Sequence, residues 1–367
     1  MTDNDPALQG LIDRVRSASA HSEPLDIRGG NTKAFYGEKQ RGAILDTTAL
    51  AGISSYEPTE LVVTARCGTP LAELEAALAE RGQCLPFEPP HFAPGGTVGG
   101  MVSAGLSGPS RAAVGSVRDF VLGATMLNGR GDVLSFGGQV MKNVAGYDVS
   151  RLLAGSMGTL GVILEVSLKV LPIAAATATL RFQFDEDTAL RRLNEWAGQP
   201  LPINASAWWN GTLVLRLRGA LAAVDAAIGT LGGDLIEADF GSRFWQGVRD
   251  QTDEFFEHAG QAVDGGANLW RLSVPGTAPP LQLHGQTLIE WGGAQRWLVS
   301  AQPPAQVREA AKKVGGHATL FRGKDKSAGV FAPLAPTLER IHHDLKKSFD
   351  PAGVFNLGRL YAGHTGL

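Results

Sequence analysis

Residues 94–108 read PGGTVGGMVSAGLSG, and residues 155–165 read GSMGTLGVILE. These stretches lie at the two ends of the most glycine-rich part of the chain, because residues 95–161 hold 16 glycines in 67 positions. The whole chain has 47 glycines in 367 residues, about 13% where globular proteins average roughly 7%. The glycines follow no fixed period and alternate with Val, Leu and Met, which excludes collagen and argues against a disordered linker. We therefore expect a folded region whose backbone comes close to a ligand.

Length and charge exclude several classes of protein. A chain of 367 residues predicts two or three domains with ample cores. The 33 basic and 36 acidic residues give a net charge of -3, and Lys and Arg occur at most in pairs, so no nucleic-acid partner is expected. The sequence shows no apolar leader and no apolar run of membrane-spanning length, so we expect a cytoplasmic protein that is at most peripheral to a membrane.

Cysteine usage limits the redox chemistry that the chain can carry alone. Only Cys67 and Cys84 occur, too few for a disulfide framework or for a cluster held by four thiolates. A reducing compartment is therefore expected, and any iron–sulfur centre that works with this chain must lie on another subunit.

The order of predicted elements divides the chain into three parts and predicts an α+β fold. Residues 1–173 form a glycine-rich domain, residues 174–330 form a second domain that we call the cap, and residues 331–367 form a helix and tail that return to the first domain. The cap order is strand, helix, strand, strand, helix, strand, which is typical of a ferredoxin-like antiparallel sheet with helices on one face. These elements are predicted at Thr177–Phe184, Asp187–Trp196, Ala205–Trp209, Thr212–Arg218, Leu221–Leu231 and Asp234–Ala238, and strands at Leu269–Val274, Arg296–Ser300 and Thr319–Arg322 could extend the sheet.

Two glycine segments have the character of anion-binding turns. We call Arg28–Thr32 (RGGNT) the first loop and Pro94–Gly100 (PGGTVGG) the second loop. Glycine lets successive backbone amides point at an anion, so phosphates can be held with few cationic side chains. Neither loop has the Gly-Lys-Ser/Thr of a nucleotide-binding P-loop, and Gly-x-Gly-x-x-Gly occurs nowhere in the chain. Each loop alone could be a structural turn, but together they favour a large cofactor that carries a diphosphate.

The same segments resemble those of a known superfamily. Gly155–Glu165 resembles the GS-x-GTLG-I-I-TE signature of FAD-linked oxidases of the vanillyl-alcohol oxidase type, also called PCMH-type flavoproteins. The first loop resembles their pyrophosphate loop, and the second loop resembles their GGT-hydrophobic-GG loop. Phe349–Pro351 followed by Asn356–Arg359 resembles their C-terminal FDP and NPGK element. The resemblance implies a two-part PCMH-type FAD-binding domain with an antiparallel cap.

A narrower resemblance concerns the E-subunit family of bacterial glycolate oxidases. It rests on Lys142–Asp148 (KNVAGYD), on Arg118–Gly123 (RDFVLG) and on the shortness of the cap. It implies oxidation of glycolate, or of another small 2-hydroxy acid, with electrons passing through FAD. The implied partners are a larger FAD-binding catalytic subunit and an iron–sulfur subunit.

The resemblance also implies which residues meet FAD. The first loop would wrap the diphosphate, the second loop with the serines after it would line the diphosphate and isoalloxazine side, and later backbone segments would meet the adenosine and ribityl portions. Asn31–Thr32 and Phe92–Ala93 stand where some relatives attach FAD covalently, so non-covalent FAD is expected. The candidates are Arg28, Gly29, Gly30, Asn31, Thr32, Pro94, Gly95, Gly96, Thr97, Val98, Gly99, Gly100, Ser103, Ser107, Gly108, Val114, Gly115, Tyr147, Gly161, Val162, Ile163 and Asn356.

Catalytic candidates follow from what oxidation of a 2-hydroxy acid requires. The carboxylate needs a cation, and the hydroxyl proton needs a base that titrates near neutral pH. The HxGDGNxH motif of larger catalytic relatives is absent, and we expect no metal site among the eight histidines. His91, directly before the second loop, is a candidate for a functional contact or for stabilising the loop. Arg296 is the catalytic cation that we select, with Arg271 and Arg322 as alternatives on predicted cap strands.

Three hypotheses remain open from the sequence. The first is an FAD-binding subunit of a glycolate-oxidising complex. The second is a self-sufficient FAD-dependent 2-hydroxy acid dehydrogenase that uses His91 and a cap arginine. The third is a non-catalytic assembly subunit that keeps the fold without the cofactor role. The flavin content of the purified chain, its response to glycolate and its partners distinguish the three.

Overall fold

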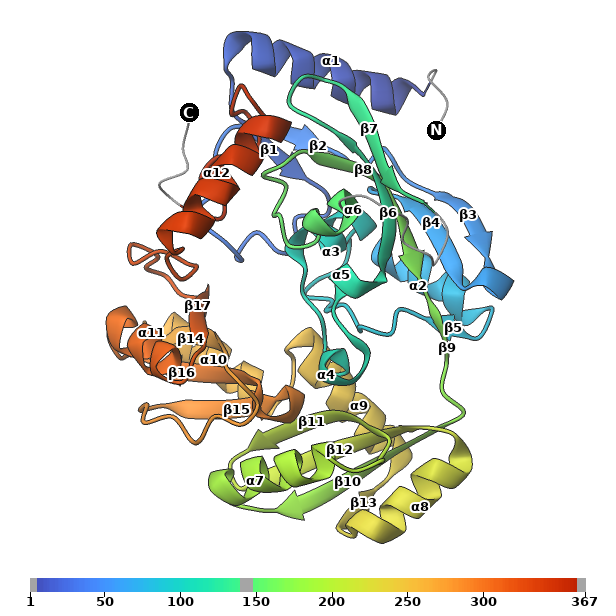
Figure 1. Ribbon diagram of the computed structural model, residues 1–367, viewed down its shortest axis with the longest axis vertical. Coiled ribbons are helices and arrows are strands. Elements are labelled where there is room, and N and C mark those ends of the chain that lie inside the picture. The colour runs from blue at the N-terminus through green and yellow to red at the C-terminus, as the bar shows by residue number, and fades with distance from the viewer. Residues whose placement is uncertain (1–4, 139–147, 362–367) are drawn as a thin grey trace.

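A computed structural model describes residues 5–138 and 148–361. Helices combine with mainly antiparallel sheets, so the fold is α+β as predicted. In Figure 1 the cap lies below a domain built in two parts. Within the described ranges, no helix is both long enough and apolar enough to span a lipid bilayer.

The first part of the upper domain joins the two ends of the chain. Helix α1 (Pro6–His21) precedes β1 (Leu25–Arg28), which pairs in parallel with β2 (Ala43–Asp46). The C-terminal tail closes this small sheet, because residue 355 pairs in parallel with residue 25 on the free edge of β1. Helix α12 (Pro336–Phe349) leads into that tail and lies beside β1 in Figure 1.

The second part is a five-stranded antiparallel sheet in the order β3-β4-β8-β6-β7. Asn128 forms the turn between β6 and β7, since its side-chain oxygen accepts N–H bonds from Arg130 and Asp132 at 2.9 Å each. Asn128–Gly131 (NGRG) has the residue types typical of a hairpin turn, and the antiparallel pairing of β6 with β7 confirms that hairpin. The strands are β3 (Ile53–Glu57), β4 (Val62–Arg66), β6 (Val121–Leu127), β7 (Val133–Gly137) and β8 (Val162–Lys169); the shorter elements are η1 (Pro58–Glu60), α2 (Leu71–Ala79), β5 (Gln83–Cys84), α3 (Val98–Ala104), α4 (Arg111–Val114), α5 (Val117–Phe120), α6 (Val149–Leu152) and β9 (Leu171–Pro172).

The first half of the cap is the ferredoxin-like unit that the sequence predicts. Its strands lie in the order β13-β10-β12-β11, so the fourth strand in the chain neighbours the first. Leu213, Leu215 and Leu217 of β12 form one face and pack under the two helices. The unit consists of β10 (Ala176–Gln183), α7 (Glu186–Ala197), β11 (Ile203–Trp209), β12 (Thr212–Gly219), α8 (Leu221–Leu231) and β13 (Asp234–Ile236).

The second half of the cap repeats this strand order. Its strands lie in the order β17-β14-β16-β15, which is again fourth, first, third, second. A loop over residues 274–285 replaces the first helix of the unit, which explains why the sequence pattern does not reveal the repeat. The two units join at their second strands through the pairs Ala207 with Glu290 and Trp208 with Ile289. The repeat consists of β14 (Asn268–Ser273), β15 (Gln286–Glu290), β16 (Gln295–Ser300), α11 (Pro304–Lys313) and β17 (His317–Arg322), with η2 (Trp291–Gly293) between β15 and β16.

The resulting eight-stranded sheet has an outer and an inner face. Helices α7, α8 and α11 cover the outer face. The inner face packs on α9 (Ala238–Asp250), on α10 (Glu254–Asp264) and on side chains of the upper domain. Tyr36 and Met157 of the upper domain share one hydrophobic cluster with Trp297 of β16. The inner face of the cap therefore looks toward the glycine-rich loops.

An ion-pair cluster ties the upper domain to the cap. Glu88 precedes the second loop, and its carboxylate lies 2.7 Å from Arg216 and 3.1 Å from Arg218 of β12. Burial opposes ionisation of this carboxyl, but the two arginines and the Ser110 amide outweigh it and hold its pKa below the usual range. The cluster therefore stabilises the domain contact only while Glu88 is ionised.

We expect Glu88→Ala to lower the free energy of unfolding by about 3 kcal/mol at neutral pH, because Arg216 then stays buried without its acid. The pKa of Glu88 in the folded protein lies below the ordinary 4.5. The difference in unfolding free energy between wild type and variant should therefore be complete above pH 4.5 and should vanish as the pH falls through the folded pKa. Urea unfolding measures it. Glu195→Ala, from an exposed pair with Arg192, is the control and should change stability by less than about 1 kcal/mol; equal effects would refute a special role for Glu88.

Candidate cofactor-binding site

The first and second loops touch each other through their backbones. A Cβ at Gly30 would lie 1.6 Å from the carbonyl oxygen of Gly95, and a Cβ at Gly29 would lie 2.3 Å from Oγ1 of Thr97. Side chains do not approach other atoms so closely, so glycine is required at both positions. The two loops, far apart in the sequence, therefore form one continuous surface.

A cavity that we call the loop cavity opens beside this contact, and both loops line it. Its walls carry three cationic side chains and no carboxylate, which matches the negative charge of a diphosphate. Amides of the glycine-rich turns add further donors for an anion. The lining residues are Ile27, Arg28, Gly29, Gly30, Asn31, Thr32, Lys33, Ala34, Gln40, Thr97, Gly100, Ser103, Ala104, Met157, Asn356 and Arg359.

The three cations of the loop cavity differ in what already binds them. Arg28 lies 2.6 Å from the buried carboxylate of Asp26. Arg359 donates to the backbone carbonyls of residues 33, 34, 36 and 38. Among the described residues no carboxylate pairs with Lys33, and burial lowers the pKa of its ammonium to about 8. Lys33 is therefore the cation whose charge most needs an anionic partner.

Asn356 connects the C-terminal tail to the walls of the loop cavity through hydrogen bonds. Its side-chain oxygen accepts the N–H of Ile27 at 2.8 Å, and its side-chain nitrogen donates to the carbonyl of Met157 at 2.6 Å. These bonds join β1, the tail and the 155–161 turn. Asn356 thus lines the loop cavity and positions its walls.

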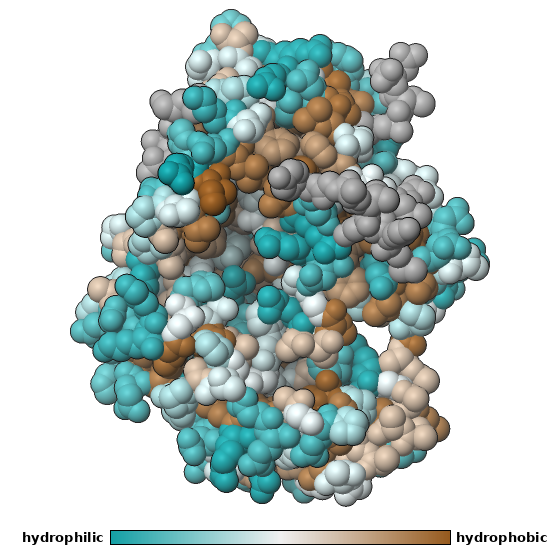
Figure 2. All heavy atoms as spheres, in the orientation of Figure 1, coloured by the Kyte–Doolittle hydropathy of each residue, from teal (hydrophilic) through white to brown (hydrophobic). Residues whose placement is uncertain are grey.

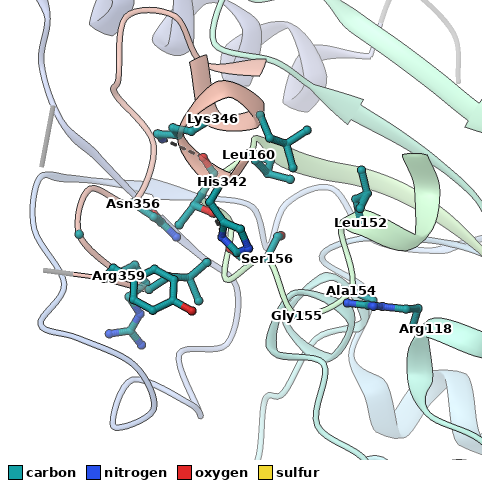
Figure 3. A pocket seen from close by; sticks show the side chains of 15 residues that line it. Arg118, Leu152, Ala154, Gly155, Ser156, Leu160, His342, Lys346, Asn356 and Arg359 are labelled. Atoms are coloured by element: carbon teal, nitrogen blue, oxygen red, sulfur yellow. Dashed lines mark hydrogen bonds between the residues drawn. The ribbon is translucent and has the colours of Figure 1, made fainter. Parts of the chain in front are cut away.

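A second cavity, the tail cavity, lies between α12, the tail and the turn before β8 (Figure 3). It shares Asn356 and Arg359 with the loop cavity, so the two cavities are neighbours. Lys346 of α12 stabilises the wall, because its ammonium donates to the carbonyls of Thr159 and Phe355 at 2.8 and 2.7 Å. Figure 2 shows hydrophobic side chains gathered beside the hollow in this region.

These features fit FAD on observations of this chain alone. Glycines leave room where backbone must approach a ligand, the loop cavity has positive charge for a diphosphate, and the adjoining tail cavity offers space for more of a long dinucleotide. No Cys or His lines the loop cavity, while His342 lines the tail cavity.

The remaining candidates in and just after the second loop divide between the ligand side and the core. Ser103 lines the loop cavity. Gly95 is exposed after Pro94, and a Cβ at Gly96 would meet only Oγ1 of Thr32, at 3.5 Å. Val98 is fully buried, and a Cβ at Gly99 would lie 2.7 Å from Cβ of Cys67. Gly99 is therefore needed for packing inside the domain.

Ser107 and Gly108 lie away from the loop cavity. They line a third cavity between the upper domain and the cap, which we call the interdomain cavity. The Ser107 hydroxyl accepts the N–H of Val117 at 3.2 Å, and the Gly108 carbonyl accepts the indole N–H of Trp291 at 3.1 Å.

The segments expected at the adenosine and ribityl portions offer mainly backbone. The side chains of Val162 and Ile163 are buried, and the residues pair with Leu127 and Met126 of β6. A Cβ at Gly161 would lie 2.4 Å from the Met126 side chain. Val114 packs against the core, and Gly115 follows it at the end of α4 with a φ of +104°. Tyr147 lies outside the described residues.

His91 is held by two contacts that orient the chain before the second loop. Its Nε2 lies 2.8 Å from a carboxylate oxygen of Glu75 on α2, and its backbone N–H donates to Asp250 of α9 at 2.9 Å. It lines neither the loop cavity nor the interdomain cavity. The geometry therefore favours the loop-stabilising alternative. Among the described residues, no cluster of three or more His, Cys, Asp or Glu could hold a metal.

Strand register separates the three candidate arginines. Arg296 is 1% exposed and faces the outer side, where it donates to the carbonyls of residues 278, 279 and 293. It therefore shapes the 274–285 loop, and the structure does not bring it to the cavities, contrary to our selection of it as the catalytic cation. Arg271 faces inward and lines the interdomain cavity. Arg322 stacks on Phe35, with its guanidinium 3.7 Å from the ring centre.

Sequence reasoning misses two residues that the structure places at cavities. Lys33 directly follows the first loop, and this position in the sequence is enough to suggest that its ammonium lies near a bound anion. Glu290 of β15 lines the interdomain cavity and is 3% exposed. No sequence signal marked Glu290, because its burial depends on the pairing of the two halves of the cap.

We expect Gly30→Ala to weaken FAD binding at least tenfold, because the added methyl group forces the two loops apart. Titration of flavin-free protein with FAD, followed by flavin fluorescence, measures the dissociation constant. Gly10→Ala on α1 is the matched control, since a Cβ there meets nothing within 4 Å, and it should bind FAD as wild type does. Wild-type affinity in Gly30→Ala would contradict the loop contact as the basis of the site.

We expect Lys33→Gln to weaken FAD binding about tenfold, the size of one lost charge-assisted contact. Because the Lys33 ammonium loses its proton near pH 8 in the ligand-free chain, wild-type affinity should fall as the pH rises through 8, and the variant should show no such fall. Titrations from pH 6 to 9.5 test this. Lys39→Gln, at an exposed position outside the cavity, should show the wild-type dependence of FAD affinity on pH. If the affinity of Lys33→Gln changed with pH in parallel with wild type, Lys33 would be excluded from the site.

One protein family and several known proteins are similar to this chain. The FAD binding domain family matches residues 8–137. The glycolate oxidase subunit GlcE of Escherichia coli (strain K12) is 48% identical over 354 residues, which cover 96% of this chain and 97% of that protein. The glycolate oxidase subunit GlcD of Bacillus subtilis (strain 168) is 30% identical over 44% of this chain and 35% of that protein. A solved alkyldihydroxyacetonephosphate synthase matches with a TM-score of 0.62 at 14% identity, covering 95% of this chain and 75% of that one.

The last match shows a shared fold, and the GlcE match extends over nearly the full length of both proteins. The matched FAD binding domain includes the first and second loops that line the loop cavity. This chain therefore belongs to the family of the glycolate oxidase subunit GlcE.

Proposed function

We propose that this chain is the FAD-binding subunit of a glycolate-oxidising complex. The observation that carries the proposal is 48% identity to a glycolate oxidase subunit over 96% of the chain, together with a loop cavity suited to a diphosphate. The reaction converts glycolate, or another small 2-hydroxy acid, to the 2-oxo acid.

When bound, FAD supplies an acceptor for two electrons from the substrate. The residues of this chain hold and orient it. The first and second loops offer backbone amides to the diphosphate, Lys33 offers an ammonium, and Asn356 keeps the tail closed over the walls. Inward-facing side chains of the cap, such as Trp297, share a hydrophobic cluster with Tyr36 and Met157 of the upper domain.

We assign two partner subunits to the complex. The sequence contains only two cysteines, and burial raises the pKa of the Cys67 thiol to about 12, so that thiol stays protonated. The iron–sulfur centre that receives the electrons is therefore placed on a second subunit. A larger flavin-containing subunit, similar to the GlcD relative, is the third member. We place the assembly in the cytoplasm, where its partners could hold it at a membrane.

Co-expression of the tagged chain with the large flavin subunit and the iron–sulfur subunit tests the proposal. We expect all three to co-purify and to reduce an artificial acceptor with glycolate, while omission of this chain abolishes turnover. Gly30→Ala in the same complex should lower turnover, whereas Gly10→Ala should not. A chain that purifies alone, with no loss of activity in the other two subunits, would refute the role.

A further inference from the structure

The interdomain cavity brings together groups from the flavin side and from the cap. Ser107 and Gly108 reach it from the segment after the second loop, and Arg271, Glu290 and Trp297 reach it from the inner face of the sheet. A cation and an acid thus share one cavity, which is also lined by the segment that follows the second loop in the sequence.

Strand register fixes the positions of these groups. Arg271 of β14 lies opposite Trp297 of β16, and Trp297 lies opposite Leu288 of β15. Glu290 is two residues further along β15, on the same inward face. Two strand spacings and two residues of rise separate the backbones of Arg271 and Glu290 by about 12 Å. Their side chains can therefore approach a small molecule from opposite sides.

Within residues 5–138 and 148–361, the Arg271 side chain has N–H groups that donate to no protein atom. One Nη donates to the hydroxyl of Tyr36 at 3.2 Å, and the guanidinium lies 5.7 Å and 5.9 Å from the ring centres of Tyr36 and Phe321. Among the described residues, no carboxylate forms an ion pair with it. A guanidinium carries five N–H groups in a planar fork, so the aromatic rings orient the fork and leave donors for a carboxylate.

Glu290 is a buried acid with an unusual environment. One carboxyl oxygen accepts bonds from the indole N–H of Trp297 at 2.6 Å and from the amide of Gln295 at 2.9 Å. Burial is the main cause that raises the pKa of the Glu290 carboxyl to about 7. The charges of Asp253 and Glu88 also raise this pKa, and the two hydrogen bonds lower it. Arg249 and Arg271 are the cations that line the same cavity. Glu290 can therefore take up or release a proton near neutral pH.

A purely structural role explains less of this arrangement. A glutamine at position 290 could accept the same two hydrogen bonds without the cost of burying an ionisable group. A buried acid and an unpaired arginine at one cavity are instead a combination found at functional sites. The cavity is narrow, so the ligand must be small.

We infer that the interdomain cavity binds a small 2-hydroxy carboxylate, with Arg271 holding the carboxylate and Glu290 accepting the proton of the 2-hydroxyl. The inference rests on the proposed function and assigns this chain a substrate site of its own. In oxidation the O–H bond breaks and its proton goes to Glu290, while the C2–H bond breaks and oxidised FAD, when bound, would accept that hydrogen together with both electrons of the bond. The C2–O bond becomes a carbonyl. The substrate thus loses two electrons and two hydrogens, of which one is the proton on Glu290 and the other is the hydrogen from C2.

Binding of oxalate, a small dicarboxylate that cannot be oxidised in this way, tests the site in the FAD-loaded chain. Titrations followed by tryptophan fluorescence and flavin absorbance give its dissociation constant. We expect Arg271→Gln to weaken the binding of oxalate at least tenfold. Arg271→Lys should have an affinity for oxalate between those of Arg271→Gln and wild type. Arg181→Gln, an exposed arginine on β10, is the matched control and should bind as wild type does.

The pH dependence tests Glu290. An ionised Glu290 repels an anion, so wild-type oxalate affinity should fall as the pH rises through about 7, and Glu290→Gln should bind oxalate without that fall. In anaerobic mixing with glycolate, Glu290→Gln should slow flavin reduction about 100-fold, the size expected for loss of a general base. A structural role for Glu290 would change unfolding temperature but leave the pH profile of binding unchanged.

The outcomes separate the two proposals. A chain that takes up no FAD fails the proposed function. A chain that holds FAD but binds no oxalate, or whose Arg271 and Glu290 variants behave like wild type, refutes the inference and leaves the FAD-binding role intact.

Discussion

The backbone contact between Gly30 and Gly95 is the constraint on which the site depends. It brings the first and second loops together at a distance that no side chain permits, and the loop cavity opens beside it. The tail then closes the same region through Asn356, so residues from both ends of the chain meet there. The glycine excess in the sequence therefore has a physical cause, since backbone has to lie against backbone and against a ligand.

The cap adds a second constraint through its repeated strand order. Joining two ferredoxin-like units at β11 and β15 makes one sheet, and the alternation of side chains decides which groups face the upper domain. That alternation places Arg271 and Glu290 inside and Arg296 outside. The ion pairs of Glu88 with β12 hold this inner face against the glycine-rich loops. Cofactor binding is thus assigned to the loop cavity, and substrate chemistry to the separate interdomain cavity.

Much of the fold and of the cofactor site was predictable from the sequence because the evidence is local. Glycine loops, the Asn128 turn and the alternation of Leu213, Leu215 and Leu217 are visible within a few residues. The second cap unit was missed because a loop replaces its first helix. The contact of His91 with Glu75 and the burial of Glu290 depend on segments that meet only in three dimensions. Arg296 was selected over Arg271 because sequence alone does not fix which face of the sheet a residue occupies.

All of the proposed chemistry requires that this chain itself forms an FAD site. The visible spectrum of the purified chain, recorded before and after anaerobic addition of glycolate, tests it most directly. We expect the absorption bands of bound oxidised flavin before addition, and bleaching of those bands by glycolate if the interdomain cavity binds substrate as inferred. A colourless chain that takes up no added FAD would contradict the presence of an FAD site in this chain.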